Sequence, residues 1–289
     1  MSDQAAKLRK QLLEDENNHR AKTISVVSGK GGVGKSNISI NLSIELLKLG
    51  KKVLLIDMDF GMGNVDVLLG LQAKRTIVDL FQHYDTFQEI IEIGPHHLAY
   101  ISGGSGLTNI FSIKQDRLDF FFEQFEQAVT EYDYIFFDIG AGASETNMPF
   151  VLAADECIVV TTPEPTSITD AYSMMKHIIN KEQKMPIYIV MNQVDTVKSG
   201  RKVFENLQQV VSRFLNVNIQ MLGILPYDRL VSQAVIRQTP YVLLDNKADI
   251  SRAMQKTAFN FITQSSSRIV ETGTPRSFIH KLRHFLRKR

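Results

Sequence analysis

The sequence contains little cysteine and no apolar run of membrane length, and each absence excludes certain kinds of site or function. Only one cysteine, Cys157, occurs among 289 residues, so a single chain can form no disulfide, no CxxC redox pair and no cysteine-ligated metal site. Cys157 lies in an apolar segment, where we expect a buried and unreactive strand residue. No cleavable signal peptide and no apolar span of membrane length is visible, so we expect a cytoplasmic protein.

Acidic residues are missing from one end of the chain. Residues 276–289 contain six lysines and arginines and no aspartate or glutamate. Removing these six positive charges from the total of +2 leaves −4 on the rest of the chain. An acidic body with a basic tail argues against a nucleic-acid-binding surface, and it predicts a local anionic partner for the tail.

Short apolar segments alternate with segments of helical periodicity. Strands are expected at 23–27, 53–56, 98–101, 134–137, 157–160, 187–190 and 221–225, and helices around 37–49, 113–130, 167–182, 201–214 and 249–264. The alternation predicts an α/β fold with a single doubly wound, mostly parallel sheet flanked by helices. Functional residues then gather at the carboxyl ends of the strands.

A glycine-rich segment, GKGGVGKS at residues 29–36, follows the first expected strand and precedes a helix. Gly29, Gly34, Lys35 and Ser36 match the phosphate-binding pattern GxxxxGK[ST]. Glycine permits the positive φ angles that direct several backbone N–H groups at one anion, beside the positive end of a helix. We expect Lys35 to pair with the outer phosphates and Ser36 to ligate Mg²⁺. The alternative, a plain glycine-rich turn, is disfavoured by the complete motif in this context.

Three aspartates follow strands that should end at the same edge of the sheet. Asp57 and Asp59 follow one strand, and Asp138 follows another. Carboxylates there can hold Mg²⁺ and orient a water molecule against a terminal phosphate, so we predict Ser36, Asp57 and Asp138 as metal ligands. Helix capping or loop solvation is the alternative for any one aspartate, and it weakens beside a phosphate-binding loop.

The glycine-rich motif carries a second lysine, and in this it resembles the deviant Walker A motif of the MinD/ParA family of ATPases. The motif comprises Gly29, Lys30, Gly31, Gly32, Val33, Gly34, Lys35 and Ser36. The resemblance covers about residues 21–265 and implies an ATP hydrolase that forms a homodimer when ATP is bound. It implies that Lys30 reaches the phosphates of the partner subunit, that Asp59 positions the attacking water, and that Asn64 lies on the first switch loop beside the nucleotide.

The resemblance also bears on the base and on the second switch loop. It implies that adenine lies between Asn192 and the loop containing Pro226 and Asp228, although Asn192 to Asp195 superficially resembles the guanine-binding motif of GTPases. ATP with Mg²⁺ is therefore the expected cofactor. The family's second switch usually reads DxPxG, whereas residues 138–142 read DIGAG. Loss of the proline predicts a looser loop.

The basic tail has the periodicity of an amphipathic helix. Its apolar positions are Phe278, Ile279, Leu282, Phe285 and Leu286, and basic residues fill the other face. We predict a membrane-targeting helix at 277–289, tethered by a flexible connector at 266–276 and attracted to anionic lipid. The alternative is a terminal helix packed on the core. MinD-like proteins use such a tail for ATP-dependent attachment to the inner face of the cell membrane.

The other end of the chain, residues 1–20, is too polar for a core and forms an N-terminal arm. Asp3, Gln4, Leu8 and Arg9 resemble the DQAxxLR motif of the FlhG (YlxH, FleN) branch of MinD-like ATPases, which controls flagellar number and placement. That resemblance implies that the arm stimulates the GTPase FlhF, and it implies flagellar C-ring proteins as further partners. Without the family, the arm is simply a solvated amphipathic helix.

Other readings of the sequence use the same nucleotide chemistry. A division-site MinD begins almost at its first strand, and a DNA-binding partition ATPase would carry its basic residues on the domain. An iron–sulfur carrier of this superfamily would need paired cysteines, which the chain lacks. A binding module that holds ATP without hydrolysing it differs from all of these only in turnover.

Overall fold

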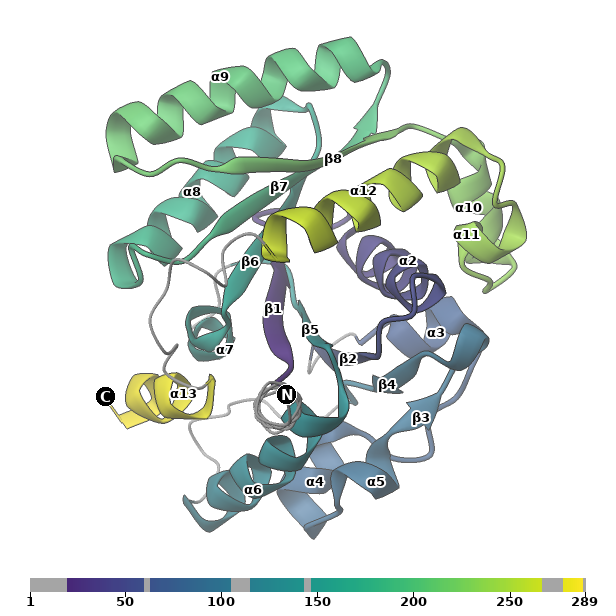
Figure 1. Cartoon of the computed structure of the whole chain (residues 1–289), viewed down its shortest axis with the longest axis vertical. Helices are drawn as coiled ribbons and strands as arrows, with labels where there is room; N and C mark the ends of the chain where they lie inside the picture. Colours follow the sequence, from purple (N-terminus) through teal and green to yellow (C-terminus); the bar gives the residue numbers. More distant parts are fainter. Residues whose placement is uncertain (1–19, 60–62, 105–114, 143–146, 267–277, 288–289) are drawn as a thin grey trace, which may run out of the picture.

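The computed structural model (Figure 1) describes residues 20–59, 63–104, 115–142, 147–266 and 278–287. Its eight strands form one sheet in the order β3-β4-β2-β5-β1-β6-β7-β8. They are β1 (Lys22–Val27), β2 (Val53–Met58), β3 (Glu92–Ile93), β4 (Ala99–Ile101), β5 (Tyr134–Ile139), β6 (Glu156–Thr161), β7 (Ile187–Val194) and β8 (Gln220–Pro226). Every neighbouring pair is parallel except β3 with β4. The predicted fold class is confirmed.

Helices cover both faces of the sheet (Figure 1). One apolar cluster lies between the sheet and α4 (Ile77–His83), α5 (Phe87–Ile90), α6 (Gln115–Glu131), α7 (Met148–Ala153), α8 (Pro165–Lys181), α9 (Val197–Leu215) and α13 (Phe278–Arg287). The other lies beneath α2 (Lys35–Lys48), α3 (Val65–Leu69), α10 (Arg229–Ile236), α11 (Tyr241–Leu244) and α12 (Asp249–Ser266). A short 3₁₀ turn, η1 (Pro95–His97), precedes β4. The central strands read as continuous apolar runs because both of their faces are buried.

The strand order places the functional edge of the sheet. β1 pairs with β5 on one side and with β6 on the other, so its carboxyl end lies where successive connections diverge to opposite sides of the sheet. Asp57 on β2 stands directly beside Asp138 on β5, and Val26 on β1 is the next partner of Asp138. Three segments distant in sequence therefore deliver the glycine-rich loop and both aspartates to one place.

The C-terminal helix forms where the sequence predicts it, but its apolar side is buried against the body. Phe278, Ile279 and Leu282 are buried in the same cluster as the sheet, and Phe285 and Leu286 pack partly against it. Figure 1 shows α13 beside α7, with α6 close by. Aromatic side chains of the body offer the helix an apolar surface, and attachment of the tail to a membrane stays a prediction. The alternative of a packed terminal helix is what the structure has.

Several sequence-based predictions concern residues that the structure does not describe. The connector falls almost entirely within 267–277, and the arm within 1–19. No helix among the described residues is long and apolar enough to cross a bilayer.

Candidate nucleotide-binding site

The glycine-rich loop has the backbone geometry of a phosphate cradle. Gly34 has φ 90° and forms the N-cap of α2, a conformation that side chains disfavour. A Cβ at Gly34 would also lie 2.6 Å from Asn192 Nδ2, and one at Gly29 would lie 2.3 Å from the backbone of Asp170 on α8. Glycines at these positions let the loop pack closely and leave the first N–H groups of α2 available to an anion.

Lys35 forms the charged centre of the site. Its Nζ lies 2.7 Å from Asp138 Oδ1 and 3.3 Å from Ser36 Oγ, and both partners of the ion pair are buried. Ser39 Oγ donates a second hydrogen bond of 2.8 Å to the same Asp138 oxygen. The structure therefore brings Lys35, Ser36 and Asp138 together, as the sequence predicts.

Asp57 supports the loop that follows β2. Its Oδ1 accepts the N–H of Asp59 at 2.9 Å, and its Oδ2 accepts those of Asn64 at 3.0 Å and Val65 at 3.2 Å. Burial, followed by the negative charge of Asp138, raises the pKa of Asp57 to about 7. Asp57 thus fixes the segment that carries Asp59 and Asn64, a role that the sequence analysis did not assign to it.

The donor set fits a magnesium ion. Two buried carboxylates, Asp57 and Asp138, stand side by side on neighbouring strands, and the ammonium group of Lys35 lies 2.7 Å from Asp138 Oδ1. The pKa of Asp57 is raised first by burial and then by the negative charge of Asp138, and a divalent cation would offset both effects. Carboxylate and hydroxyl oxygens are the ligands that Mg²⁺ prefers, usually few in number and completed by water. The ion would be held, directly or through water, by Ser36, Asp138 and Asp57. Both carboxylate oxygens of Asp57 already accept hydrogen bonds from backbone N–H groups.

The carboxylate of Asp59 packs against the second switch loop. A Cβ at Gly140 would lie 3.3 Å from Asp59 Cγ and 3.4 Å from Asn147 Nδ2. The absence of a side chain at Gly140 therefore leaves room for Asp59. In the described part of the loop, Gly142 N–H donates to Ser28 O at 3.0 Å, next to the end of β1. The looseness expected from the missing proline stays a prediction. Glycine in place of the family's proline thus has a packing reason.

Lys30 points away from its own glycine-rich loop. Its Nζ lies 2.8 Å from Glu164 Oε2 and 3.2 Å from Thr166 Oγ1, at the start of α8. The side chains of Lys30 and Glu164 are 41% and 63% exposed, so this ion pair is accessible and weak. Lys30 is available to a group outside its own site.

The residues predicted to hold the base lie at the ends of β7 and β8. Asn192 Nδ2 donates to Val33 O at 2.8 Å, so this amide already contacts the phosphate loop. Pro226 ends β8 beside Val194 of β7. Asp228 caps α10, with its Oδ1 accepting Leu230 N–H at 2.9 Å. Adenine recognition by these residues stays a prediction.

Three polar contacts of the site were missed by the sequence analysis. Ser39 lies one helical turn after Lys35, so the spacing alone could have indicated that it faces Asp138. Glu164 and Thr166 lie 134 and 136 positions from Lys30, and no local pattern connects them to it. The predicted partner-binding residues Asp3, Gln4, Leu8 and Arg9 lie outside the described residues.

Comparison with known proteins places this site in a family. The ParA family model, described as "NUBPL iron-transfer P-loop NTPase", matches residues 19–262. The antiactivator FleN of Pseudomonas aeruginosa is 37% identical over 221 residues, which cover 76% of this chain and 79% of FleN. The flagellum site-determining protein YlxH of Helicobacter pylori is 38% identical over 223 residues, 76% of this chain and 74% of YlxH.

Solved structures share the fold. The MinC:MinD cell division complex of Aquifex aeolicus contains a chain with TM-score 0.68 and 26% identity, covering 89% of this chain and 99% of that one. MinD of Pyrococcus horikoshii complexed with Mg-ADP has TM-score 0.67 and 22% identity, covering 86% and 98% of the two chains. The second of these similarities is evidence of fold alone.

Proposed function

Since this chain belongs to the MinD/ParA family of P-loop NTPases, in the branch of FleN and YlxH that is also called FlhG, we propose that it is an ATPase that regulates flagellar placement and number. The observation that carries the nucleotide chemistry is the arrangement of Lys35, Ser36 and Asp138 under the N-terminus of α2. Water attacks the γ-phosphorus of ATP, the bond to the β–γ bridging oxygen breaks, and ADP and phosphate leave.

Each residue of the site has a separate role in ATP hydrolysis. Lys35 exchanges its contact with Asp138 for the β- and γ-phosphates, and the N–H groups of the loop stabilise the remaining charge. Ser36 and Asp138 would hold Mg²⁺, which would supply positive charge beside the phosphates. Asp59, beside Gly140, orients the attacking water.

Dimerisation with ATP is the step that completes the site. Lys30 lies on the surface and pairs weakly with Glu164 in its own chain. It gains a phosphate partner only when a second subunit presents its nucleotide, so ATP favours the dimer and ADP the monomer. Lys30→Ala should abolish the ATP-dependent dimer in light scattering, whereas Lys51→Ala, at a partly exposed position between α2 and β2, should leave it intact. An unchanged dimer in Lys30→Ala would contradict the proposal.

Membrane attachment requires α13 to leave the body. Its buried residues are those that would enter the lipid, so the packed helix and the membrane-bound helix exclude each other. We propose that the ATP-bound dimer releases two tails, which together bind anionic membrane more strongly than one short helix can. Liposome co-sedimentation that requires ATP and residues 277–289 would support this; equal binding with ADP and ATP would contradict the switch.

The flagellar role rests on the arm and on the similarity to FleN and YlxH. A peptide of residues 1–20 should accelerate GTP hydrolysis by FlhF, because Gln4 can orient water beside the partner's nucleotide. Gln4→Ala should lose the acceleration while keeping most of the binding, and Leu8→Ala should weaken the binding. A basal rate with the wild-type peptide would leave a division-site or partition ATPase as the alternative. C-ring proteins are further proposed partners.

A further inference from the structure

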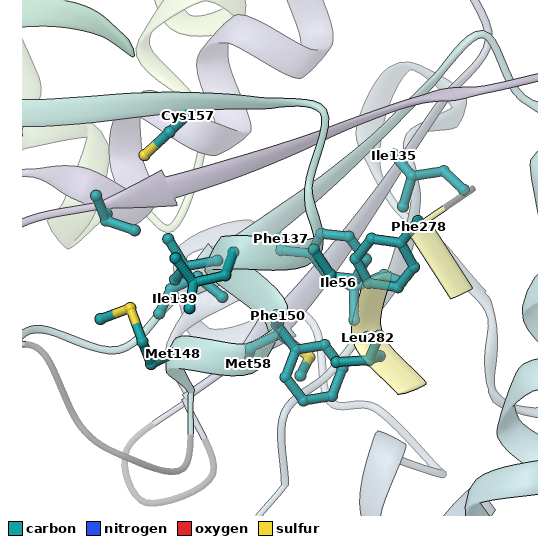
Figure 2. Close-up of a cluster of buried hydrophobic side chains, with 14 of the residues drawn as sticks. Ile56, Met58, Ile135, Phe137, Ile139, Met148, Phe150, Cys157, Phe278 and Leu282 are labelled. Atoms are coloured by element: carbon teal, nitrogen blue, oxygen red, sulfur yellow. The ribbon is translucent and has the colours of Figure 1, made fainter. Parts of the chain in front are cut away.

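The C-terminal helix fills an apolar groove that we call the tail groove, defined by Phe122 and Phe125 of α6, Phe137 of β5 and Phe150 of α7. The ring of Phe278 lies 4.7 Å from that of Phe125 and 4.9 Å from that of Phe137. Figure 2 shows Phe278 and Leu282 beside Phe137 and Phe150. A released tail would uncover these aromatic rings, which is unfavourable in water unless another apolar surface covers them.

The rim of the tail groove is acidic where the tail is basic. Arg283 Nη2 lies 3.7 Å from Asp119 Oδ1. The guanidinium carbon of Arg283 lies 4.7 Å from the centre of the Phe122 ring. Lys281 lies 3.9 Å from Asp155 on the opposite rim. Leu282, between these two basic residues, is fully buried. The tail groove is therefore complementary to an apolar residue flanked by lysine and arginine.

The N-terminal arm carries the same tripeptide. Lys7-Leu8-Arg9 repeats Lys281-Leu282-Arg283, and Leu12 lies four positions after Leu8 as Leu286 does after Leu282. In this alignment Gln4 and Ala5 stand in place of Phe278 and Ile279, so the arm lacks the side chain that stacks between the rings. The arm matches the groove in charge and in its leucines, and should occupy it less strongly than the tail.

The arm also joins the body at the end of the groove. Ala21 is buried in the same apolar cluster, and its N–H donates to Val129 O at 2.7 Å. Val129 lies one helical turn after Phe125 on α6, a rise of about 6 Å. The 13 residues from Leu8 to Ala21 span up to about 40 Å when extended, so Leu8 can reach the groove easily.

We propose that residues 3–13 of the arm occupy the tail groove of their own chain once α13 has left it. Leu8 takes the place of Leu282, Arg9 pairs with Asp119 and Lys7 with Asp155. The inference rests on the release of the tail under the proposed function. It adds a regulation, because Leu8 and Arg9 cannot contact FlhF while they lie in the groove: release of the tail to the membrane then conceals the arm.

The test measures the distance between the arm and α6 in the full-length chain. Spin labels are placed at Ala6→Cys and Gln127→Cys; the native Cys157 is buried and does not need removal. With the tail packed, we expect a broad distribution of distances. Phe278→Glu with Leu282→Glu displaces the tail, and a narrow peak at short distance should then appear. Thermal unfolding checks that both forms are folded.

Further variants identify the contact. Leu8→Ser in the displaced-tail chain should abolish the short peak, whereas Asn17→Ser, outside the proposed segment, should retain it. Arg9→Glu should abolish the short peak, and adding Asp119→Arg to the same chain should restore it. An arm that bound the groove nonspecifically would not show this recovery. The same broad distribution in packed-tail and displaced-tail chains, or a short peak that survives Leu8→Ser, would overturn the proposal.

Dilution with unlabelled protein distinguishes docking of the arm within one chain from docking between two chains. The conditions of the measurement also let this inference fail independently of the proposed function. A short peak that disappears on mixing with excess unlabelled protein would overturn the proposal in favour of exchange between chains. The measurement uses no nucleotide, lipid or FlhF. A chain without ATPase activity or lipid binding can therefore still show arm docking, and an active chain can fail to show it.

Discussion

The nucleotide site and the tail groove lie in different parts of one fold, and they are stabilised by opposite means. In the nucleotide site, buried charges compensate one another: Lys35 pairs with Asp138, while the pKa of neighbouring Asp57 is raised to about 7. In the tail groove, aromatic rings are covered by Phe278 and Leu282. The proposed function requires both sets of contacts to be exchanged: Lys35 leaves Asp138 for phosphate, and α13 leaves the tail groove for lipid. The predictions below test whether the two replacements are independent.

The largest effect is expected from removing the ammonium group of the nucleotide site. Lys35→Ala should abolish ATP binding measured by calorimetry. It should also lower the free energy of unfolding by about 3 kcal/mol near pH 8, because Asp138 is left buried beside Asp57 without a cation. Asp138→Asn in the same chain should recover part of that stability, although not the binding. Stability equal to wild type in Lys35→Ala would show that the ion pair contributes nothing.

Asp59→Ala should separate turnover from binding. We expect at least about a 100-fold lower ATPase rate with ATP binding and dimerisation intact, because only the orientation of water is lost. Asp249→Ala, on an exposed part of α12, is the matched control. If Asp59→Ala turns over normally, the role of orienting water passes to Asp138 or Asp57.

Much of the nucleotide site was predictable from sequence because its determinants are local. Continuous apolar runs located the seven longer strands, and the spacing of residues 29–36 located the phosphate loop. The two-residue strand β3 and the short helices were missed, since a few residues show no periodicity. The contact of Lys30 with Glu164 was not predicted, because the two residues are 134 positions apart in sequence and only the fold brings them together.

The tail groove was not predictable for a different reason. An amphipathic pattern specifies that one face of α13 must leave water, but lipid and a cluster of phenylalanines satisfy that requirement equally. The aromatic residues of α6 and β5 that receive Phe278 lie more than a hundred positions away in sequence. Only their arrangement in the fold shows that the body offers this surface.

The pH dependence of stability should report the burial of Asp57 beside Asp138 in the nucleotide site. The pKa of Asp57 is raised from 3.8 to about 7, so the folded chain binds this proton more tightly than the unfolded chain. The contribution is therefore full below about pH 4 and is lost as pH rises towards 7, with a slope of at most about 1.4 kcal/mol per pH unit. Denaturant unfolding without nucleotide between pH 4 and 8 would measure it. A flat profile for wild type, or the same slope in Asp57→Asn, would contradict the assignment.

The rim of the tail groove should control lipid binding without any change in the tail. Asp119→Lys places a positive charge opposite Arg283, which should weaken packing of α13 and increase co-sedimentation with anionic liposomes in the presence of ADP, by about fivefold for 1 kcal/mol. Glu131→Lys, at the last residue of α6, adds the same charge elsewhere. Equal binding by the two variants would attribute the gain to net charge alone. Unchanged ATP affinity in Asp119→Lys would show that the two sites are energetically separate in the nucleotide-bound monomer.

The smallest effect is expected where the second switch loop contacts Asp59. A Cβ at Gly140 would lie 3.3 Å from Asp59 Cγ, a distance that a small displacement of the carboxylate can relieve. Gly140→Ala should therefore fold and bind ATP normally, yet lower the turnover rate several-fold, because hydrolysis depends on the position of the carboxylate more steeply than binding does. Gly142→Ala is the matched variant, since φ at Gly142 is 84° and its Cβ would meet nothing within 4 Å. There the strain is in the backbone, so we expect a loss of stability rather than of turnover per folded chain. Single-turnover kinetics alongside thermal unfolding would distinguish the two outcomes. If Gly140→Ala retains the full rate, the contact with Asp59 has no part in catalysis, and glycine at this position is explained by the contact with Asn147 alone.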